Sequence, residues 1–204
     1  MTTIAFDGTY LAADTRTTHA GGAPETARSK RCTVCDGHAD TTFSYARKLE
    51  RSFPRKPVVF QGESVKAWGT AGCGSMGRAF DQAMKSGLDM EALSTVLSFV
   101  HGHSGHALVI TEENVYDITF GKMWRCKKIT ELPYAIGSGG KAAMLAMKRF
   151  GYSAMGAVAC AADVDKSTGG DIHYYNCRWV RSDEELAPTV ETINYTEAEL
   201  FGQG

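Results

Sequence analysis

The sequence predicts an α+β fold in which groups of strands alternate with pairs of helices along the chain. Short apolar runs between turn-forming residues predict the strands. Longer segments with apolar residues three or four positions apart predict the helices. Two sheets packed face to face, with the helices outside, would bury the apolar side of every element. The order of the elements alone leaves other arrangements open.

The first strands are predicted as a hairpin at the start of the chain. Thr3–Phe6 and Tyr10–Ala13 flank Asp7-Gly8, and Asp-Gly between apolar runs is a strong signal for a two-residue turn. Further strands, the first two of which form a hairpin around Gly62-Glu63, are predicted at Pro57–Gln61, Val65–Gly69, Ala107–Thr111, Val115–Phe120, Trp124–Ile129, Tyr134–Ile136 and Asp171–Val180.

Two pairs of helices are predicted from the helical spacing of apolar residues. The first pair begins with Gly74–Ser86, which Gly87 ends, because glycine readily adopts the left-handed conformation that closes many helices. Asp89 is placed to cap the second helix, whose apolar face extends to Val100. The second pair is predicted at Gly139–Phe150 and Ser153–Asp163.

The composition is that of one globular domain. The chain has 204 residues, is 43% hydrophobic and carries a net charge of −1, so we expect a single domain over residues 1–204. The near-neutral charge gives no reason to expect nucleic acid or an anionic membrane as a partner. No apolar run approaches the length of a membrane span, and Asp7 and Gly8 interrupt the apolar core that an export signal would need. Six scattered cysteines favour reduced thiols and a cytoplasmic location.

Charge is unevenly distributed along the chain. Arg28–Lys56 holds eight Lys or Arg against three Asp or Glu, whereas Ser182–Gly204 holds six acidic residues and no basic one. A solvated loop and a solvated tail would explain both segments. The alternative is that the basic segment of one subunit meets the acidic tail of another.

Thr2 is the first candidate for chemistry. Removal of Met1 would leave Thr2 with a free α-amine and a β-hydroxyl on the same residue. A hydroxyl alone is a poor nucleophile at neutral pH, but an adjacent amine can act as its general base. Threonine is common at position two, so this interpretation depends on the rest of the chain.

Four further blocks accompany Thr2-Thr3 in a fixed order: Asp14-Thr15-Arg16, Ala67–Gly72, Tyr134–Gly140 and Asp165–Gly170. In these blocks the chain resembles the proteasome β-subunit family and its bacterial ring-peptidase relatives. The resemblance covers most of the chain, except for an enlarged segment at about 17–57 and the acidic tail at about 182–204. It implies the four-layer αββα sandwich of N-terminal nucleophile hydrolases.

The resemblance also implies roles for individual residues. Thr2 is the nucleophile, and Asp14 matches the aspartate that holds a buried lysine beside it. Gly72 matches the residue whose backbone N–H faces the oxyanion, where a glycine lets the substrate backbone approach closely. The remaining matches are Ser138, beside the nucleophile, and the late pair Asp165 and Thr168, where the family usually has serine in place of Thr168.

The lysine has two candidates. Lys48, in Arg47-Lys48-Leu49-Glu50-Arg51, fits the local pattern of the family and is our choice. Lys56 lies at a spacing from the Gly69–Gly72 block that is closer to the usual one. Either cation would lower the pKa of the nearby amine and stabilise developing negative charge.

Other kinds of site are less well supported. The Gly-Ser-Gly-Gly loop at Gly137–Gly140 lacks the residues of a phosphate-binding loop. Cys32, Cys35 and His38 supply three of the four ligands that a structural zinc needs. His101, His103 and His106 give a similarly weak signal. We therefore expect no cofactor and no metal.

The predicted function is a threonine-type endopeptidase that acts on peptides or unfolded proteins within a homo-oligomeric ring. Some members of the family need an ATPase partner, and nothing in this sequence identifies one. One alternative is a small-amide hydrolase on the same fold, because the fold does not determine the substrate. The other is a proteasome-like chain without activity that serves as an assembly component.

Overall fold

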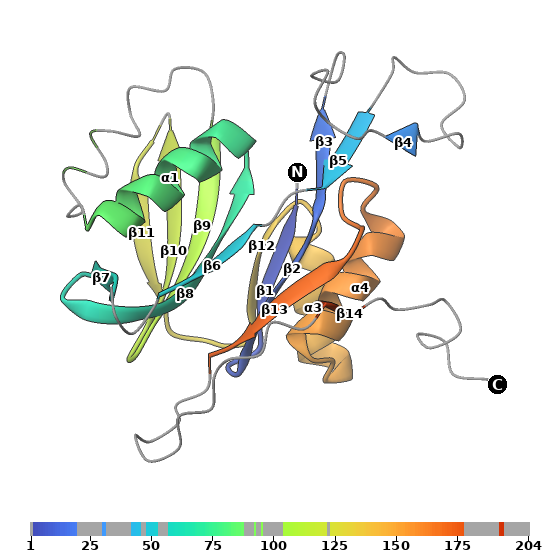
Figure 1. The fold of residues 1–204 in the computed structure, drawn as a ribbon. Helices are drawn as coiled ribbons and strands as arrows, with labels where there is room; N and C mark the ends of the chain where they lie inside the picture. Colours follow the sequence, from blue (N-terminus) through green and yellow to red (C-terminus); the bar gives the residue numbers. More distant parts are fainter. Residues whose placement is uncertain are drawn as a thin grey trace.

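A computed structural model describes residues 2–19, 30–31, 42–45, 48–52, 57–87, 92, 95, 104–121, 123–177 and 192–193. These residues form a mixed α/β fold whose strand pairings are all antiparallel (Figure 1). Two larger sheets face each other, and a small three-stranded sheet projects beyond them (Figure 1). No helix in the described part of the chain is long and apolar enough to cross a membrane.

The first sheet has the strand order β12-β1-β2-β13-β14. The predicted hairpin at the start of the chain is confirmed, with Ile4 paired to Ala13 across it. On its other side β1 pairs with β12 and places Thr3 opposite Gly137. The sheet consists of β1 (Thr3–Phe6), β2 (Tyr10–Asp14), β12 (Tyr134–Gly137), β13 (Ile172–Asn176) and β14 (Thr192–Ile193).

The second sheet has the order β11-β10-β9-β8-β6, with β7 paired to β8. The sequence did not predict β6, which is three residues long and begins immediately after Lys48. The sheet consists of β6 (Leu49–Arg51), β7 (Val59–Phe60), β8 (Glu63–Gly72), β9 (Ser104–Thr111), β10 (Val115–Gly121) and β11 (Arg125–Ile129).

The helices are α1 (Gly74–Ser86), α3 (Gly140–Phe150) and α4 (Ala154–Val164), close to their predicted bounds. Gly87 ends α1 in the left-handed conformation, as predicted. Ser153 caps α4, and its side chain accepts a hydrogen bond from the N–H of Gly156. The helix expected after Asp89 lies outside the described residues except for Ala92 and Thr95, which are helical.

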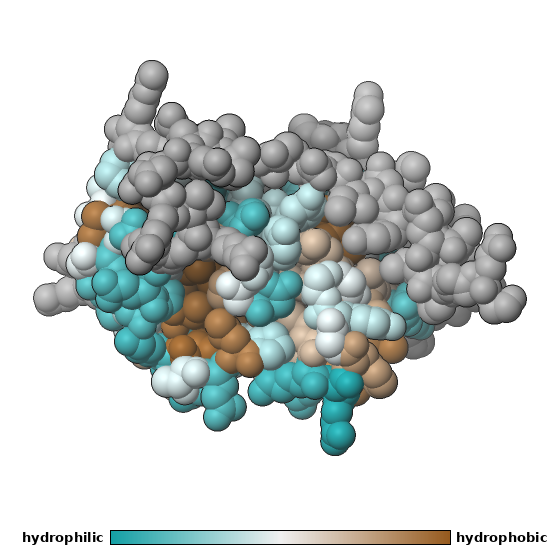
Figure 2. Space-filling model, turned by 90° about the horizontal axis from the view of Figure 1, so that it is seen from below, coloured by the Kyte–Doolittle hydropathy of each residue, from teal (hydrophilic) through white to brown (hydrophobic). Residues whose placement is uncertain are grey.

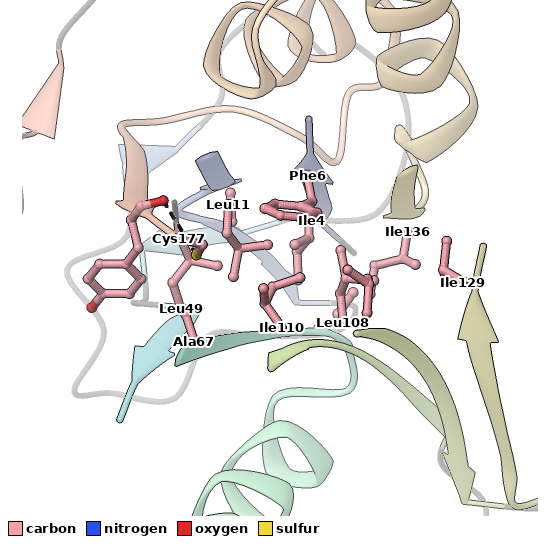
Figure 3. Packing of buried hydrophobic residues seen from close by; sticks show 14 residues of the cluster. Ile4, Phe6, Leu11, Leu49, Ala67, Leu108, Ile110, Ile129, Ile136 and Cys177 are labelled. Carbon is pink, nitrogen blue, oxygen red and sulfur yellow. Dashed lines mark hydrogen bonds between the residues drawn. The ribbon is translucent and has the colours of Figure 1, made fainter. Parts of the chain in front are cut away.

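Three apolar clusters pack these elements together. Between the two sheets, Ile4 and Leu11 of one sheet meet Leu108 and Ile110 of the other (Figure 3). On the outer face of the six-stranded sheet, α1 packs over a cluster of large side chains: Trp68, Met76, Phe80, Val109 and Phe120. On the outer face of the five-stranded sheet, α3 and α4 pack through small side chains: Ala5, Ala12, Ala143, Ala157 and Val158.

The structure corrects several predicted bounds. The second hairpin turns at Gln61-Gly62 and not at Gly62-Glu63, because Phe60 pairs with Glu63. Both turn residues have positive φ, 53° and 81°, which suits the tight turns that match strand twist. The enlarged segment at about 17–57 contributes β3 (Arg16–His19), β4 (Lys30–Arg31) and β5 (Thr42–Tyr45), which form the small sheet. Of the acidic tail, the structure describes β14, which extends the five-stranded sheet of the same chain.

Candidate active site

The hydroxyl of Thr2 is held by a buried carboxylate. Thr2 precedes β1 and is only 3% exposed. Its Oγ1 donates to Oδ1 of Asp14, at the end of β2, over 3.0 Å. The N–H of Thr3 donates to the same oxygen over 2.8 Å. The β1–β2 hairpin therefore brings the start of the chain to Asp14, as the Asp-Gly turn predicts.

The other oxygen of Asp14 holds a lysine. Lys48 Nζ lies 3.0 Å from Asp14 Oδ2, with side-chain exposures of 9% and 0%. Lys48 also donates to the carbonyl of Arg16, and the N–H of Gly169 donates to Asp14 Oδ2 over 3.1 Å. The two oxygens of Asp14 thus accept four donors, which satisfies a buried carboxylate.

Burial lowers the pKa of Lys48 below its ordinary value of 10.5. The attraction and hydrogen bond of Asp14 oppose this effect, while the nearby charge of Arg16 adds to it. A lysine whose pKa is lowered in this way is a typical component of sites that move protons. The short strand β6 positions Lys48, because its first residue, Leu49, pairs with Gly69 of β8.

A second carboxylate, that of Asp165, is linked to Thr2 through Ser138. The N–H of Ser138 donates to the carbonyl of Thr2 over 2.9 Å, and the Ser138 hydroxyl donates to Asp165 Oδ2 over 2.5 Å. Gly137, with φ of 94°, makes room for this approach. A Cβ there would lie 1.8 Å from the carbonyl oxygen of Thr2.

Asp165 accepts several neutral donors. Thr168 Oγ1 donates to its Oδ2 over 2.7 Å, and the N–H of Ser167 donates to its Oδ1 over 3.0 Å. Burial acts to raise the pKa of Asp165, but the hydrogen bonds from Ser138, Thr168 and Ser167 outweigh it, so the pKa lies below its usual value. Asp165 is therefore ionised at neutral pH.

The remaining predicted residues have different outcomes. Gly72 ends β8 just before α1 and has φ of 105°, and it pairs with Gly105 of β9. The structure gives Gly72 no hydrogen bond to the other candidate residues. Lys56, together with the possible zinc ligands Cys32, Cys35 and His38, lies outside the described residues, as do His101 and His103. Among the described residues, no three metal-ligating side chains are grouped.

Sequence reasoning overlooked two residues of this cluster. Thr3 joins it through both its N–H and its hydroxyl, which lies 2.7 Å from Thr168 Oγ1. Gly169 donates its N–H to Asp14, and its carbonyl accepts from the N–H of Arg16. The Thr-Thr start and the Gly-Gly pair were visible in the sequence, but only the fold shows which groups they reach.

The arrangement combines a hydroxyl, a buried cation and two carboxylates around the start of β1. The Asp14–Lys48 pair can stabilise negative charge that develops near Thr2. Ser138 and Asp165 can hold the backbone of Thr2 in place, because the N–H of Ser138 is bonded to the Thr2 carbonyl and its hydroxyl is bonded to Asp165. Such a combination can support nucleophilic attack by a hydroxyl at a carbonyl.

Comparisons with known proteins identify the fold. No protein-family model and no curated protein matches the sequence. Among solved structures, the helical assembly of the Anbu complex from Pseudomonas aeruginosa is similar with a TM-score of 0.58 and 15% identity, over 98% of this chain and 89% of that one. Anbu from Hyphomicrobium sp. strain MC1 gives a TM-score of 0.53 and 14% identity. Its Gly-1 mutant gives 0.51 and 12%, and each of the two comparisons covers 86% of this chain and 81% of the other.

These findings correct the family suggested by the motifs. The similar structures are Anbu proteins, whose fold is related to that of proteasome-like N-terminal nucleophile proteins but which form a distinct family. The assignment to proteasome β-subunits and their ring-peptidase relatives is therefore wrong. At 12–15% identity the likeness shows the fold alone. Families that share a fold can have similar short motifs around the same position, so the motifs around Thr2 do not distinguish these families.

Proposed function

We propose that this protein is a threonine-type N-terminal nucleophile hydrolase that cleaves peptide bonds in peptides or unfolded proteins. One observation carries the proposal: Asp14 holds both the Thr2 hydroxyl and the cation of Lys48, at 3.0 Å each, in a buried site. The proposal requires that Thr2 becomes the first residue through removal of Met1. Its amine is then free to act as the general base.

In the proposed reaction the Thr2 hydroxyl leaves its hydrogen bond to Asp14 and attacks the substrate carbonyl. The α-amine of Thr2 takes the hydroxyl proton and delivers it to the leaving amine as the C–N bond breaks. An ester forms on Thr2, and water then attacks it while the same amine accepts a proton from the water and returns it to the Thr2 oxygen as the ester C–O bond breaks. Lys48 and the N–H of Gly72 stabilise the oxyanion in both steps.

Ser138, Asp165 and Thr168 form the second part of the proposed site. Asp165 is ionised and accepts the hydroxyls of the other two. In the proposal, the negative charge of Asp165 stabilises the protonated form of the Thr2 α-amine, which exists midway through each step. The Ser138 N–H also fixes the carbonyl of Thr2, which holds the backbone of the nucleophile in place.

We also propose a cytosolic homo-oligomer built from single-domain subunits with the four-layer αββα architecture. The packing of α1 on one sheet and of α3 and α4 on the other supports these layers. Large apolar side chains are exposed, among them Phe150 and Val164 at the ends of α3 and α4. Apolar groups also gather between hydrophilic borders on the face seen in Figure 2. Such surfaces suit contact with other subunits, and one similar structure is a helical assembly.

Replacement of the nucleophile tests the proposal. Thr2→Ala should abolish hydrolysis of fluorogenic peptides, while Thr2→Ser, which keeps the amine and a hydroxyl, should retain part of it. Thr15→Val is a matched control, because Thr15 is a buried threonine whose Oγ1 has no hydrogen-bond partner among the described residues. Undiminished turnover in Thr2→Ala would refute the assignment.

An inactive assembly component is the second candidate. It is favoured by the low exposure of Thr2, 3%, and by the helical assembly of the similar Anbu structure. Light scattering together with the peptide assay separates the candidates. An oligomer without Thr2-dependent hydrolysis supports the assembly component, whereas an active monomer of about 22 kDa supports a small-amide hydrolase.

A further inference from the structure

Thr3 is bonded directly to Asp14 and is linked to Asp165, the other carboxylate of the candidate site, through Thr168. Its N–H donates to Asp14 Oδ1 over 2.8 Å. Its hydroxyl lies 2.7 Å from Thr168 Oγ1, which in turn lies 2.7 Å from Asp165 Oδ2. Thr3 and Thr168 are both 0% exposed, so water does not compete for these hydroxyls.

The direction of the hydrogen bond between the two threonines follows from a count of protons. A threonine hydroxyl has one proton to donate. Thr168 donates its proton to Asp165, because an ionised carboxylate can only accept. The proton between the two threonines must therefore come from Thr3. The result is a directed chain, which we call the hydroxyl chain: Thr3 donates to Thr168, and Thr168 donates to Asp165.

Gly139 provides the space for the hydroxyl chain. A Cβ at this position would lie 2.2 Å from Thr3 Oγ1 and 3.0 Å from Thr168 Oγ1. The backbone of Gly139 has φ of −85°, which any residue can adopt, so its conformation does not require glycine. Glycine is needed because the two hydroxyls occupy the space that a side chain at this position would fill.

We infer that Thr3 is a positioning residue whose hydroxyl, through Thr168, orients and stabilises the Asp165 carboxylate, which Ser138 links to the backbone of Thr2. Hydrogen bonds in a chain polarise one another, so donation by Thr3 makes Thr168 a better donor to Asp165. The backbone N–H of Thr3 also donates to Asp14. Thr3 therefore helps to fix the spacing between the two carboxylates. The effect of Thr3 on catalysis rests on the proposed function, whereas the existence of the hydroxyl chain does not.

The key variant is Thr3→Val, which keeps the shape of the side chain and removes the hydroxyl. Thr3→Ser restores the hydroxyl and should restore wild-type behaviour. Thr15→Val is the matched control, because it makes the same change at a buried threonine outside the hydroxyl chain. Gly139→Ala is a second way to disturb the hydroxyl chain if Thr3→Val does not fold.

The first measurement needs no activity. The carboxyl carbon of Asp165, labelled through ¹³C-aspartate and assigned with Asp165→Asn, is titrated by NMR in each variant. We expect the pKa of Asp165 to shift upward in Thr3→Val and Gly139→Ala, and to match the wild type in Thr3→Ser and Thr15→Val. An Asp165 titration that is the same in Thr3→Val as in the wild type would overturn the hydroxyl chain.

The second measurement tests the catalytic consequence. In Thr3→Val we expect kcat to fall roughly threefold to tenfold, the scale of one hydrogen bond, with KM unchanged and the acidic limb of the pH profile moved to higher pH. Wild-type kcat and an unmoved pH profile in Thr3→Val would overturn the positioning role. If the wild type shows no Thr2-dependent hydrolysis, the proposed function fails, and the titration alone decides whether the hydroxyl chain exists.

Discussion

The two carboxylates beside Thr2 are satisfied in different ways. Asp14 is fully buried and accepts hydrogen bonds from four donors, one of which is the cation of Lys48. Asp165 is only half-buried, and its donors are neutral hydroxyl and amide groups from Ser138, Thr168 and Ser167. One region is thus a buried ion pair, and the other is a hydroxyl-lined carboxylate near the surface.

This difference separates structural from chemical roles. A buried ion pair becomes costly when one partner is removed, because the remaining charge has lost both water and its counterion. A half-exposed carboxylate can be neutralised with little effect on stability, since water can replace its partners. Changes at Asp14 should therefore alter stability and activity together, whereas changes at Asp165 should alter activity alone.

The largest effect is expected at the ion pair. Asp14→Asn should abolish hydrolysis and lower the free energy of unfolding by about 3 kcal/mol, because the Lys48 cation is left buried without its counterion. Chemical denaturation and the peptide assay measure the two effects. Equal stability of Asp14→Asn and the wild type would contradict the buried pair.

A double variant controls this result. Asp14→Asn combined with Lys48→Met removes both charges and should recover much of the stability, but none of the activity. Lys56→Met tests the alternative lysine and should leave activity nearly unchanged. If Lys56→Met inactivates the protein and Lys48→Met does not, the catalytic role belongs to Lys56.

At the second carboxylate a smaller and purely functional effect is expected. Asp165→Asn should reduce kcat by roughly a hundredfold, the scale of lost electrostatic support, while the free energy of unfolding changes by less than about 1 kcal/mol. Ser167→Ala keeps the backbone donor to Asp165 and serves as the control. A loss of stability as large as that of Asp14→Asn would remove the contrast between the two regions.

Asp81, a carboxylate outside the candidate site, tests through the pH dependence of stability how burial affects a carboxylate. Asp81 on α1 accepts one hydrogen bond, from Nε1 of Trp68. Burial raises its pKa to about 6, and Glu50 adds to the rise, against the effects of Trp68 and Lys85. The folded protein therefore binds more protons at Asp81 than the unfolded chain between about pH 4 and pH 6. Stability from this group falls as the pH rises through that range.

Asp81→Asn should remove this dependence without affecting hydrolysis. Relative to the wild type, the variant should gain about 2 kcal/mol between pH 4 and pH 7, as judged from a pKa raised by roughly two units and reduced for partial exposure. Urea denaturation of both proteins at the two pH values measures the difference. A gain with the opposite sign would show that the donors of Asp81 dominate over its burial.

Much of the fold and part of the site were predictable from the sequence, because they depend on local patterns. The Asp7-Gly8 turn and the apolar spacing of α1, α3 and α4 identified those elements within a few residues. The turn also brings Thr2 and Asp14 together, since it pairs Ile4 with Ala13. Lys48 was chosen over Lys56 from its immediate neighbours, and it lies on Asp14 in the structure.

The rest depends on contacts between distant segments. The short strand β6 has no pattern of its own and forms because Leu49 fits against Gly69, where a Cβ would meet the Leu49 side chain at 2.7 Å. The link between Thr3 and Thr168 spans 165 positions, so local sequence gives no sign of it. The family was misidentified for a related reason, because motifs around one site cannot distinguish families that share the fold.

The central claim is that Thr2 is a free N-terminal nucleophile. The most direct test is the mass of the N-terminal peptide after the purified protein has reacted with a peptide-like acylating electrophile. We predict a peptide that begins at Thr2 and carries one adduct, and no adduct in Thr2→Ala. A protein that hydrolyses peptides while Met1 remains fully present, or that is modified only elsewhere, would contradict the claim.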